Sequence, residues 1–263
     1  MSRLIAIASG KGGVGKTCLA IGLAQALAQA GRGVTLVDGD LGLANVDVQL
    51  GLNPAADLAG VLAGRVGAAQ ALIAHPAGFA VLAGRSGDGG LAALAGEGLG
   101  RLLALLRHLP GEDVLLDLGA GLGPVQRGLA AAADLLLVIA TEEPTSLTDA
   151  YAVLKLHRRD APAGEAGLVV NMASGAAQAR RVHATLDAAC RGFLGAGVDL
   201  LGVVRRDPHV PAAIRAQQPL LTRHPATPAA EDLRALAGRL ANGLGSPIAR
   251  EHAASWASPP PRT

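Results

Sequence analysis

The sequence predicts an α/β protein with one mostly parallel, twisted sheet covered by helices on both faces. Seven short apolar runs have the pattern of buried strands, at residues 4–9, 34–39, 79–84, 114–119, 135–141, 168–173 and 200–204. Continuous apolar runs are typical of parallel strands that are buried on both sides. Stretches with helical spacing separate most of these runs, and such alternation indicates right-handed βαβ units.

The helices are expected at residues 17–30, 91–109, 146–159, 176–191 and 230–244. Residues 57–90 are rich in Gly and Ala and less periodic, which predicts a peripheral helical excursion plus a strand. We therefore expect one domain over residues 1–245, a size that can bury a large core, with residues 230–244 as its C-terminal helix. Residues 246–263 contain a Ser-Pro-Pro-Pro run and are expected to be a disordered tail.

Composition excludes several classes of protein. With 50% hydrophobic and 17% charged residues, the chain is globular rather than disordered. Its formal net charge of +2 does not indicate nucleic-acid binding, which needs a clustered basic patch, so no specific nucleic-acid partner is expected. Cys18 and Cys190 form no CxxC pair, which predicts two buried free thiols rather than a zinc site or a disulfide framework. The seven histidines lack metal-ligand spacing and are expected at the surface or as caps.

The N-terminal segment predicts a cytoplasmic protein. It has one basic residue and a short apolar run that leads directly into a Gly-rich loop, unlike a signal peptide with its cleavage site. No apolar run approaches the roughly 20 residues that a membrane span needs.

A phosphate-binding loop follows the first predicted strand and opens the first predicted helix. Its residues match the pattern G-x-x-x-x-G-K-[ST]: Gly10, Lys11, Gly12, Gly13, Val14, Gly15, Lys16 and Thr17. The backbone N–H groups of such a loop surround phosphate oxygens. Lys16 reaches the β- and γ-phosphates, and the Thr17 hydroxyl can ligate Mg²⁺. Cys18 directly follows and is included in the expected site. A plain Gly-rich turn would not need Lys-Thr at the helix start.

Further polar residues follow the other predicted strands, namely Asp38, Asp40, Asp117 and Asn171. Ligands bind at the carboxyl ends of strands in open α/β sheets, so one site is expected to collect these residues. A carboxylate at position 38 or 40 can reach a metal ion or the attacking water, although a strand-end Asp can also cap the next turn. Asp117 ends an apolar strand and precedes glycines, a pattern that suits Mg²⁺ binding beside a moving loop.

Lys11 is a second lysine within the loop, and the form KGGVGKT resembles the deviant P-loop of the MinD/ParA ATPases. That resemblance implies ATP and Mg²⁺ as cofactors and an ATP-dependent homodimer in which Lys11 reaches the phosphates of the other subunit, much as an arginine finger does. The alternative is a solvated loop lysine. The resemblance also implies that Asp40 positions the attacking water, with Asp38 in a supporting part, and that Thr17, Asp40 and Asp117 surround the metal ion.

Three positions are less regular. Leu118 stands where the family usually has Thr or Ser after the Asp117 position, so residue 118 offers no polar contact. Asn171 matches the position whose amide reads the adenine edge, but it could also be a turn former. The run LGVVRRDPHVPAAI (201–214) resembles a later nucleotide-binding motif, with Asp207 in the acidic place and Arg205 where proline is usual.

The branch of the family is suggested by LGLANVDVQLGL (41–52) and EPTSLTDAYAVLK (143–155). Both resemble the flagellar-number regulators FlhG and FleN, and next MinD, more than plasmid-partition ParA. Over residues 4–214 the resemblance implies slow ATP hydrolysis and a protein partner, either a flagellar transcriptional activator or an assembly GTPase. Nitrogenase iron proteins are disfavoured, because the loop after Asp117 has no cysteine for a bridging cluster.

Three alternatives stay open at this point. A MinD-type division ATPase would contact the inner face of the cell membrane through residues 230–244, where one helical face carries Leu233, Leu236, Ala237, Leu240 and Leu244. The same face could instead pack on the domain. A ParA-like partition ATPase would bind DNA through surface arginines, and a binding module would not hydrolyse ATP at all.

Overall fold

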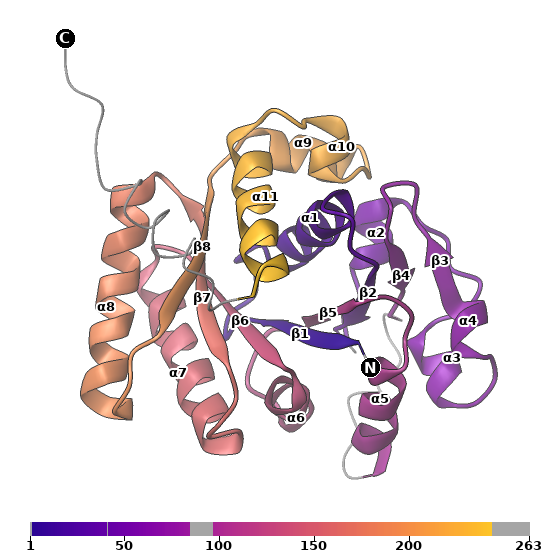
Figure 1. Cartoon of the computed structure of the whole chain (residues 1–263), viewed down its shortest axis with the longest axis horizontal. Helices are drawn as coiled ribbons and strands as arrows, with labels where there is room; N and C mark the ends of the chain where they lie inside the picture. Colours follow the sequence, from indigo (N-terminus) through magenta and orange to yellow (C-terminus); the bar gives the residue numbers. More distant parts are fainter. Residues whose placement is uncertain (1, 41, 85–96, 244–263) are drawn as a thin grey trace.

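The computed structural model describes residues 2–40, 42–84 and 97–243, and within them eight strands form one sheet (Figure 1). The strand order is β3-β4-β2-β5-β1-β6-β7-β8. The bounds are β1 Arg3–Ala8, β2 Val34–Gly39, β3 Leu72–Ala74, β4 Ala80–Leu82, β5 Asp113–Leu118, β6 Leu135–Ala140, β7 Ala166–Ala173 and β8 Asp199–Arg205. Only the β3–β4 pair is antiparallel among the pairs in this sheet. The predicted fold class and its seven strands are confirmed, and the missed β3 is a three-residue edge strand.

The helices are α1 Lys16–Gln29, α2 Val46–Leu50, α3 Leu58–Leu62, α4 Ala68–Ala71, α5 Glu97–Arg107, α6 Pro124–Ala132, α7 Pro144–Asp160, α8 Ala176–Leu194, α9 His209–Arg215, α10 Leu220–Arg223 and α11 Pro228–Ala241. Five of them match the predicted helices, and residues 91–96 of the predicted helix at 91–109 lie outside the described part. The sequence reading missed α6, which starts with Pro at its first turn. Leu244 and the predicted tail at 246–263 also lie outside the described residues.

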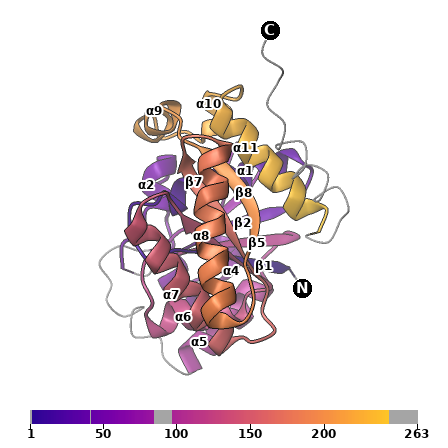
Figure 2. The same cartoon turned by 90° about the vertical axis from the view of Figure 1, so that its left-hand side faces the viewer.

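The central strand β1 is continuously apolar from Leu4 to Ala8 because helices cover both of its faces. Leu4, Ala6 and Ala8 point to the core under α5, α6, α7 and α8, whereas Ile5 and Ile7 point to the core under α1 and α11. Figures 1 and 2 show these two helical layers on opposite faces of the sheet. With helices on both sides, all residues from Leu4 to Ala8 are buried, so the alternation typical of a half-exposed strand disappears.

The C-terminal helix α11 packs on the domain. Leu233, Leu236, Ala237 and Leu240 are at most 3% exposed and belong to the core that includes α1. A Cβ at Gly22 of α1 would lie 2.5 Å from Leu233 Cδ1, so the two helices approach closely at this glycine. Of the two alternatives for this apolar face, its described residues therefore follow the second and pack on the domain. Within the described residues, no helix is long and apolar enough to cross a bilayer.

Candidate functional site

The phosphate-binding loop connects the buried strand β1 to helix α1. Gly13 and Gly15 have φ angles of +81° and +85°, which side-chain-bearing residues rarely adopt. Alternation of left-handed and ordinary residues turns successive N–H groups to the inside of the loop, where they can bind an anion. Gly15 also caps α1, whose first turn has no acidic residue. The positive end of the helix dipole is therefore available for phosphate.

Asn171 supports this loop from β7. Its Nδ2 donates a buried hydrogen bond of 2.7 Å to the carbonyl oxygen of Val14. A Cβ at position 15 would lie 2.5 Å from the same Nδ2, so Gly15 is required by space as well as by its φ angle. One N–H of the Asn171 amide is thus used to brace the loop, and a contact between this side chain and adenine stays a prediction.

Asp38 holds the segment that follows β2. It is fully buried, and its carboxylate accepts hydrogen bonds from the backbone N–H groups of Asp40 (3.1 Å), Asn45 (2.8 Å) and Val46 (2.9 Å). Burial raises the pKa of Asp38 to about 6, although these three N–H groups act in the opposite direction. In the described chain Asp38 holds the Asp40 loop and the start of α2 in place, and its supporting part in hydrolysis stays a prediction.

Asp117 lies beside Asp38 because β5 pairs with β2 in a register that places these two residues opposite each other. It is 2% exposed, and its Oδ1 has no hydrogen-bond partner. Burial raises the pKa of Asp117 to about 7, with the Thr17 hydroxyl acting to lower it and Asp38 to raise it. An unpaired buried carboxylate oxygen next to a hydroxyl fits Mg²⁺, which prefers oxygen ligands.

Asp40 directly follows β2 and lines one hollow together with Lys16 and Thr17. Its Oδ1 accepts hydrogen bonds from the N–H groups of Gly42 (3.3 Å) and Leu43 (3.0 Å). A Cβ at Gly119, just after β5, would lie 3.0 Å from this oxygen. A side chain at position 119 would therefore crowd Asp40, and among the described residues no hydrogen bond to Oδ2 of Asp40 is found, so this oxygen can face a water or a metal ion.

Lys11 is turned towards α7 rather than into the loop. Its Nζ donates to Glu143 Oε2 (2.8 Å) and Thr145 Oγ1 (3.2 Å) at the start of α7. Both side chains of the ion pair are exposed, at 42% for Lys11 and 62% for Glu143. Sequence reasoning missed Glu143 and Thr145 as contacts of Lys11, although they begin the stretch 143–155 that resembles the flagellar branch.

A single hollow of about 620 Å³ collects most of the predicted residues. Those that line it are Gly12, Gly13, Gly15, Lys16, Thr17, Cys18, Asp40, Asn171 and Asp207. The predicted residues Gly10, Lys11, Val14 and Asp117 are not in its lining, since Val14 and Asp117 are buried behind the loop. The far wall comes from Met172, Arg206 and α9. Arg206 and most of α9 belong to the predicted motif at 201–214, whereas Met172 was not predicted.

Cys18 lines the hollow but is not a reactive thiol. It is partly exposed, in contrast to the expected buried thiol, whereas Cys190 is buried as expected. Burial, and next the charge of Asp117, raises the pKa of Cys18 to about 12. Its thiol is therefore protonated at neutral pH and is a poor nucleophile.

Asp207 serves mainly as a local brace. Its Oδ1 accepts from the backbone N–H (2.9 Å) and Nδ1 (2.8 Å) of His209, and its Oδ2 accepts from the N–H of Ala229 (3.2 Å). Arg205, which replaces the usual proline, turns away to α11, where its Nε lies 2.8 Å from Asp232. A direct contact of Asp207 with the nucleotide stays a prediction.

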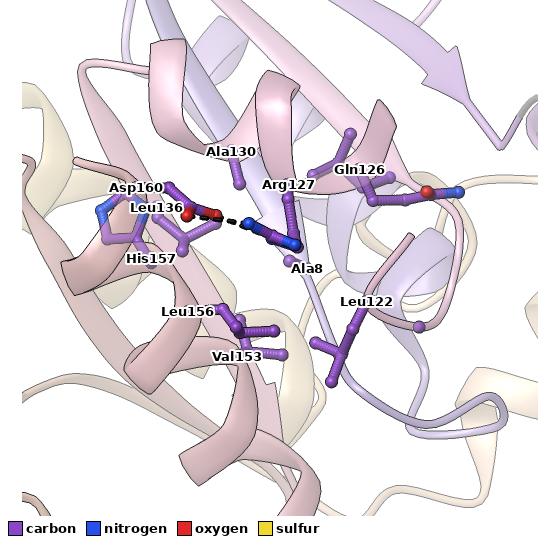
Figure 3. Close-up of a pocket in the computed structure, with 12 residues that line it drawn as sticks. Ala8, Leu122, Gln126, Arg127, Ala130, Leu136, Val153, Leu156, His157 and Asp160 are labelled. Atoms are coloured by element: carbon purple, nitrogen blue, oxygen red, sulfur yellow. Dashed lines mark hydrogen bonds and ion pairs between the residues drawn. The ribbon is translucent and has the colours of Figure 1, made fainter. Parts of the chain in front are cut away.

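A second and much smaller hollow lies between α6 and α7 (Figure 3). Two hydrogen bonds between Arg127 and Asp160, of 2.7 and 2.8 Å, join the two helices beside it. Its volume of about 20 Å³ has room for one water molecule, so it cannot hold a nucleotide. His157 lines it and is 4% exposed, which corrects the expectation of surface histidines: it shares a helical face with the buried Val153 and Leu154.

Comparison with known proteins agrees with this geometry. Residues 5–220 match the family model of the CobQ/CobB/MinD/ParA nucleotide binding domain. The chain is 36% identical over 240 residues to the antiactivator FleN of Pseudomonas aeruginosa, covering 90% of this chain and 86% of FleN. It is 31% identical over 187 residues to the flagellum site-determining protein YlxH of Helicobacter pylori, covering 70% and 63%.

Among solved structures, the septum site-determining protein MinD of Pyrococcus horikoshii, complexed with Mg-ADP, superposes with a TM-score of 0.78 at 25% identity. That match covers 94% of this chain and 100% of MinD. The expected cofactors, ATP and Mg²⁺, agree with it. The chain therefore belongs to the CobQ/CobB/MinD/ParA nucleotide-binding family, as an ATPase of the MinD/ParA type that is similar to the FleN and YlxH flagellar proteins.

Proposed function

We propose that this chain is an ATP-dependent dimerisation switch with slow ATP hydrolysis, and that it regulates the number or placement of flagella. The position of Lys11 carries the proposal. Although it belongs to the phosphate-binding loop, its Nζ lies at an exposed ion pair with Glu143 outside the hollow. From there it can reach the phosphates of a second copy that faces the same edge of the sheet.

Exposed apolar side chains support a protein contact at this edge. The described residues contain five exposed large hydrophobic side chains, and two of them, Leu43 and Ile214, line the nucleotide hollow. A third, Val48, lies in α2, the helix that follows Leu43. Leu43 is 71% exposed and Val48 59%. Apolar groups that gather beside a ligand site favour a partner surface there, and a second copy would cover them together with the nucleotide.

The proposed hydrolysis depends on positioning and charge. Lys16 and the loop N–H groups hold the phosphates, Asp40 orients the attacking water, and the Lys11 of the other copy stabilises charge that develops on the γ-phosphate. Thr17, Asp40 and Asp117 would hold Mg²⁺, which neutralises phosphate charge when it is bound. Cleavage would then separate the two copies.

Two substitutions test the switch. We expect the wild-type protein to hydrolyse ATP, Lys16→Ala to lose ATP binding, and Asp40→Ala to bind ATP, dimerise and stall. Phosphate release measures turnover, and light scattering after size exclusion measures the molecular mass. Each is measured with ATP and with ADP. An Asp40→Ala protein that stays monomeric in ATP argues against the switch. Wild-type turnover equal to background would identify a binding module.

The cellular role rests on similarity to FleN and YlxH, whose names refer to an antiactivator and to flagellum site determination. A flagellar transcriptional activator or an assembly GTPase is the partner we propose. Flagella per cell and division-site placement are counted by electron microscopy after in-frame deletion in the native host. Altered flagellar number with normal division supports the flagellar role, whereas minicells with normal flagella indicate a division role.

A MinD-type role is a second candidate, because the chain is also 31% identical to MinD of Bacillus subtilis over 84% of its length. This role places the protein at the inner face of the cell membrane. It predicts ATP-dependent binding to anionic liposomes in solution. The buried apolar face of α11 disfavours that outcome, and failure to bind lipid rejects it. A ParA-like role predicts DNA binding that weakens steeply with salt, and a flat salt response rejects it.

A further inference from the structure

Gln217 ends helix α9 in a conformation that usually requires glycine. Its φ angle is +52°, in the left-handed region. The N–H of Gln217 donates to the carbonyl of Ile214 (2.9 Å) and the N–H of Gln218 to that of Ala213 (3.1 Å), which together form a Schellman motif. Glycine is the usual residue at this position of the motif, and any other L-residue pays a conformational cost. Something else must therefore favour glutamine here.

The side chain of Gln217 provides that reason, because it joins α9 to α2. Its Nε2 donates to the carbonyl oxygen of Val48 in α2, at 3.0 Å. Gly51, which ends α2 with a φ angle of +63°, packs against the same side chain: a Cβ at this position would lie 3.1 Å from Gln217 Cβ. Gln217 thus packs against a glycine that leaves room for its side chain. Its hydrogen-bond partner, Val48, is 169 residues away in the sequence.

The two helices that Gln217 joins are neighbours, and both border the nucleotide hollow. From α9 and its neighbours, Val210, Ile214 and Gln218 line the far wall. On the other side of the Gln217 contact, α2 begins with Val46, whose N–H, together with that of Asn45, binds Asp38. Asp38 in turn accepts the N–H of Asp40 at 3.1 Å. Hydrogen bonds and one short helix therefore lead continuously from the far wall to Asp40.

We propose that Gln217 is a positioning residue that couples the α9 wall of the nucleotide hollow to the Asp40 loop. A nucleotide that presses on α9 fixes α2 through the Gln217–Val48 bond, and α2 fixes Asp40 through Asp38. Gln217 itself touches neither the phosphates nor the water. The proposal rests on the proposed function of Asp40 in hydrolysis, and it adds a residue that makes this function depend on how the far wall is occupied.

Two variants separate this role from simple stabilisation. Gln217→Gly keeps the Schellman motif and removes both the conformational cost and the donor, so the protein should be at least as heat-stable as wild type. Gln217→Glu keeps the length of the side chain but cannot donate to a carbonyl when ionised. We expect kcat for ATP to fall about fivefold in both variants, within the range for residues that couple two sites, while the Kd for ADP changes less than about twofold.

Hydrogen exchange measures the coupling directly. With ADP bound, we expect amide exchange to slow over residues 12–17 and over residues 42–50 in wild type. In both variants the slowing at 12–17 should persist and that at 42–50 should be lost. The proposal is overturned if kcat and the exchange response stay at wild-type level in either variant, or if only melting temperature changes.

Asp40→Ala is measured in parallel, so that failure of the proposed function can be recognised. If Asp40→Ala hydrolyses ATP at the wild-type rate, the role of Asp40 fails. The exchange comparison still decides whether Gln217 couples the α9 wall to α2 and the Asp40 loop, since it does not depend on turnover.

Discussion

Lys11 Nζ lies 2.8 Å from Glu143 Oε2 in the same chain, at the first turn of α7. The family resemblance implies that Lys11 contacts the phosphates of the other subunit, whereas here it pairs with a residue of its own subunit. Because both side chains are exposed to water, this ion pair contributes little free energy. So weak an ion pair can break, and Lys11 can then contact the phosphates of a second copy.

Replacing Glu143 should therefore favour the dimer. For Glu143→Gln we expect dimerisation with a non-hydrolysable ATP analogue at up to about fivefold lower protein concentration, because Lys11 loses a competing partner. Sedimentation velocity measures the change, and it should shrink in high salt. Glu142→Gln removes the same charge one residue away and serves as the control. Weaker dimerisation of Glu143→Gln would mean that Glu143 acts within the dimer instead.

Asn171→Ala should weaken nucleotide binding without regard to the base. The substitution removes the 2.7 Å bond that braces Val14 in the phosphate-binding loop, and a bond of this kind is worth about 1 kcal/mol, or roughly fivefold in affinity. Calorimetry with ATP and with GTP measures both affinities. An equal loss supports the bracing role, whereas a loss confined to ATP would show that the amide reads adenine, as the resemblance implies.

Leu236→Ala should destabilise the whole domain. Leu236 is 1% exposed and belongs to the core between α11 and α1, and such truncations cost about 2–5 kcal/mol in the free energy of unfolding. Urea unfolding followed by circular dichroism gives the value. Phe193→Ala is the control, because Phe193 is 80% exposed and should change stability by less than about 0.5 kcal/mol. A Leu236→Ala protein as stable as this control would contradict the packing of α11.

His157 should make the protein less stable in mild acid. Burial lowers its pKa, although Asp160 acts in the opposite direction. The unfolded chain takes up the proton near pH 6.5, whereas the folded chain does so only at lower pH. The free energy of unfolding therefore falls as pH drops below about 6.5, until the lowered pKa is passed.

His157→Leu should remove this part of the pH dependence and leave the rest. Unfolding is compared at pH 7.5, 6.5 and 5.5, with His108→Gln, an exposed histidine of the segment after α5, as the matched control. If His157→Leu keeps the wild-type slope between pH 6.5 and 5.5, another group is responsible for the acid sensitivity.

The fold and the centre of the site could be predicted because their signals are local in the chain. Continuous apolar runs identified the central strands, and the spacing of Gly10, Gly15, Lys16 and Thr17 identified the phosphate-binding loop. Strand ends then placed Asp40 and Asp117 near it, since parallel strands end at the same edge. The three-residue strand β3 carries too few residues for any period to emerge, and it was missed.

The sequence by itself determined the class of fold, the nucleotide-binding loop and the family of the chain. Only the tertiary structure decided that α11 is buried, that Asn171 braces Val14, that Lys11 pairs with Glu143 and that Gln217 reaches Val48. Each of these contacts joins segments more than 100 residues apart, or depends on which face of a helix meets the sheet. The order and register of the strands set such contacts, and no pattern of neighbouring residues encodes them.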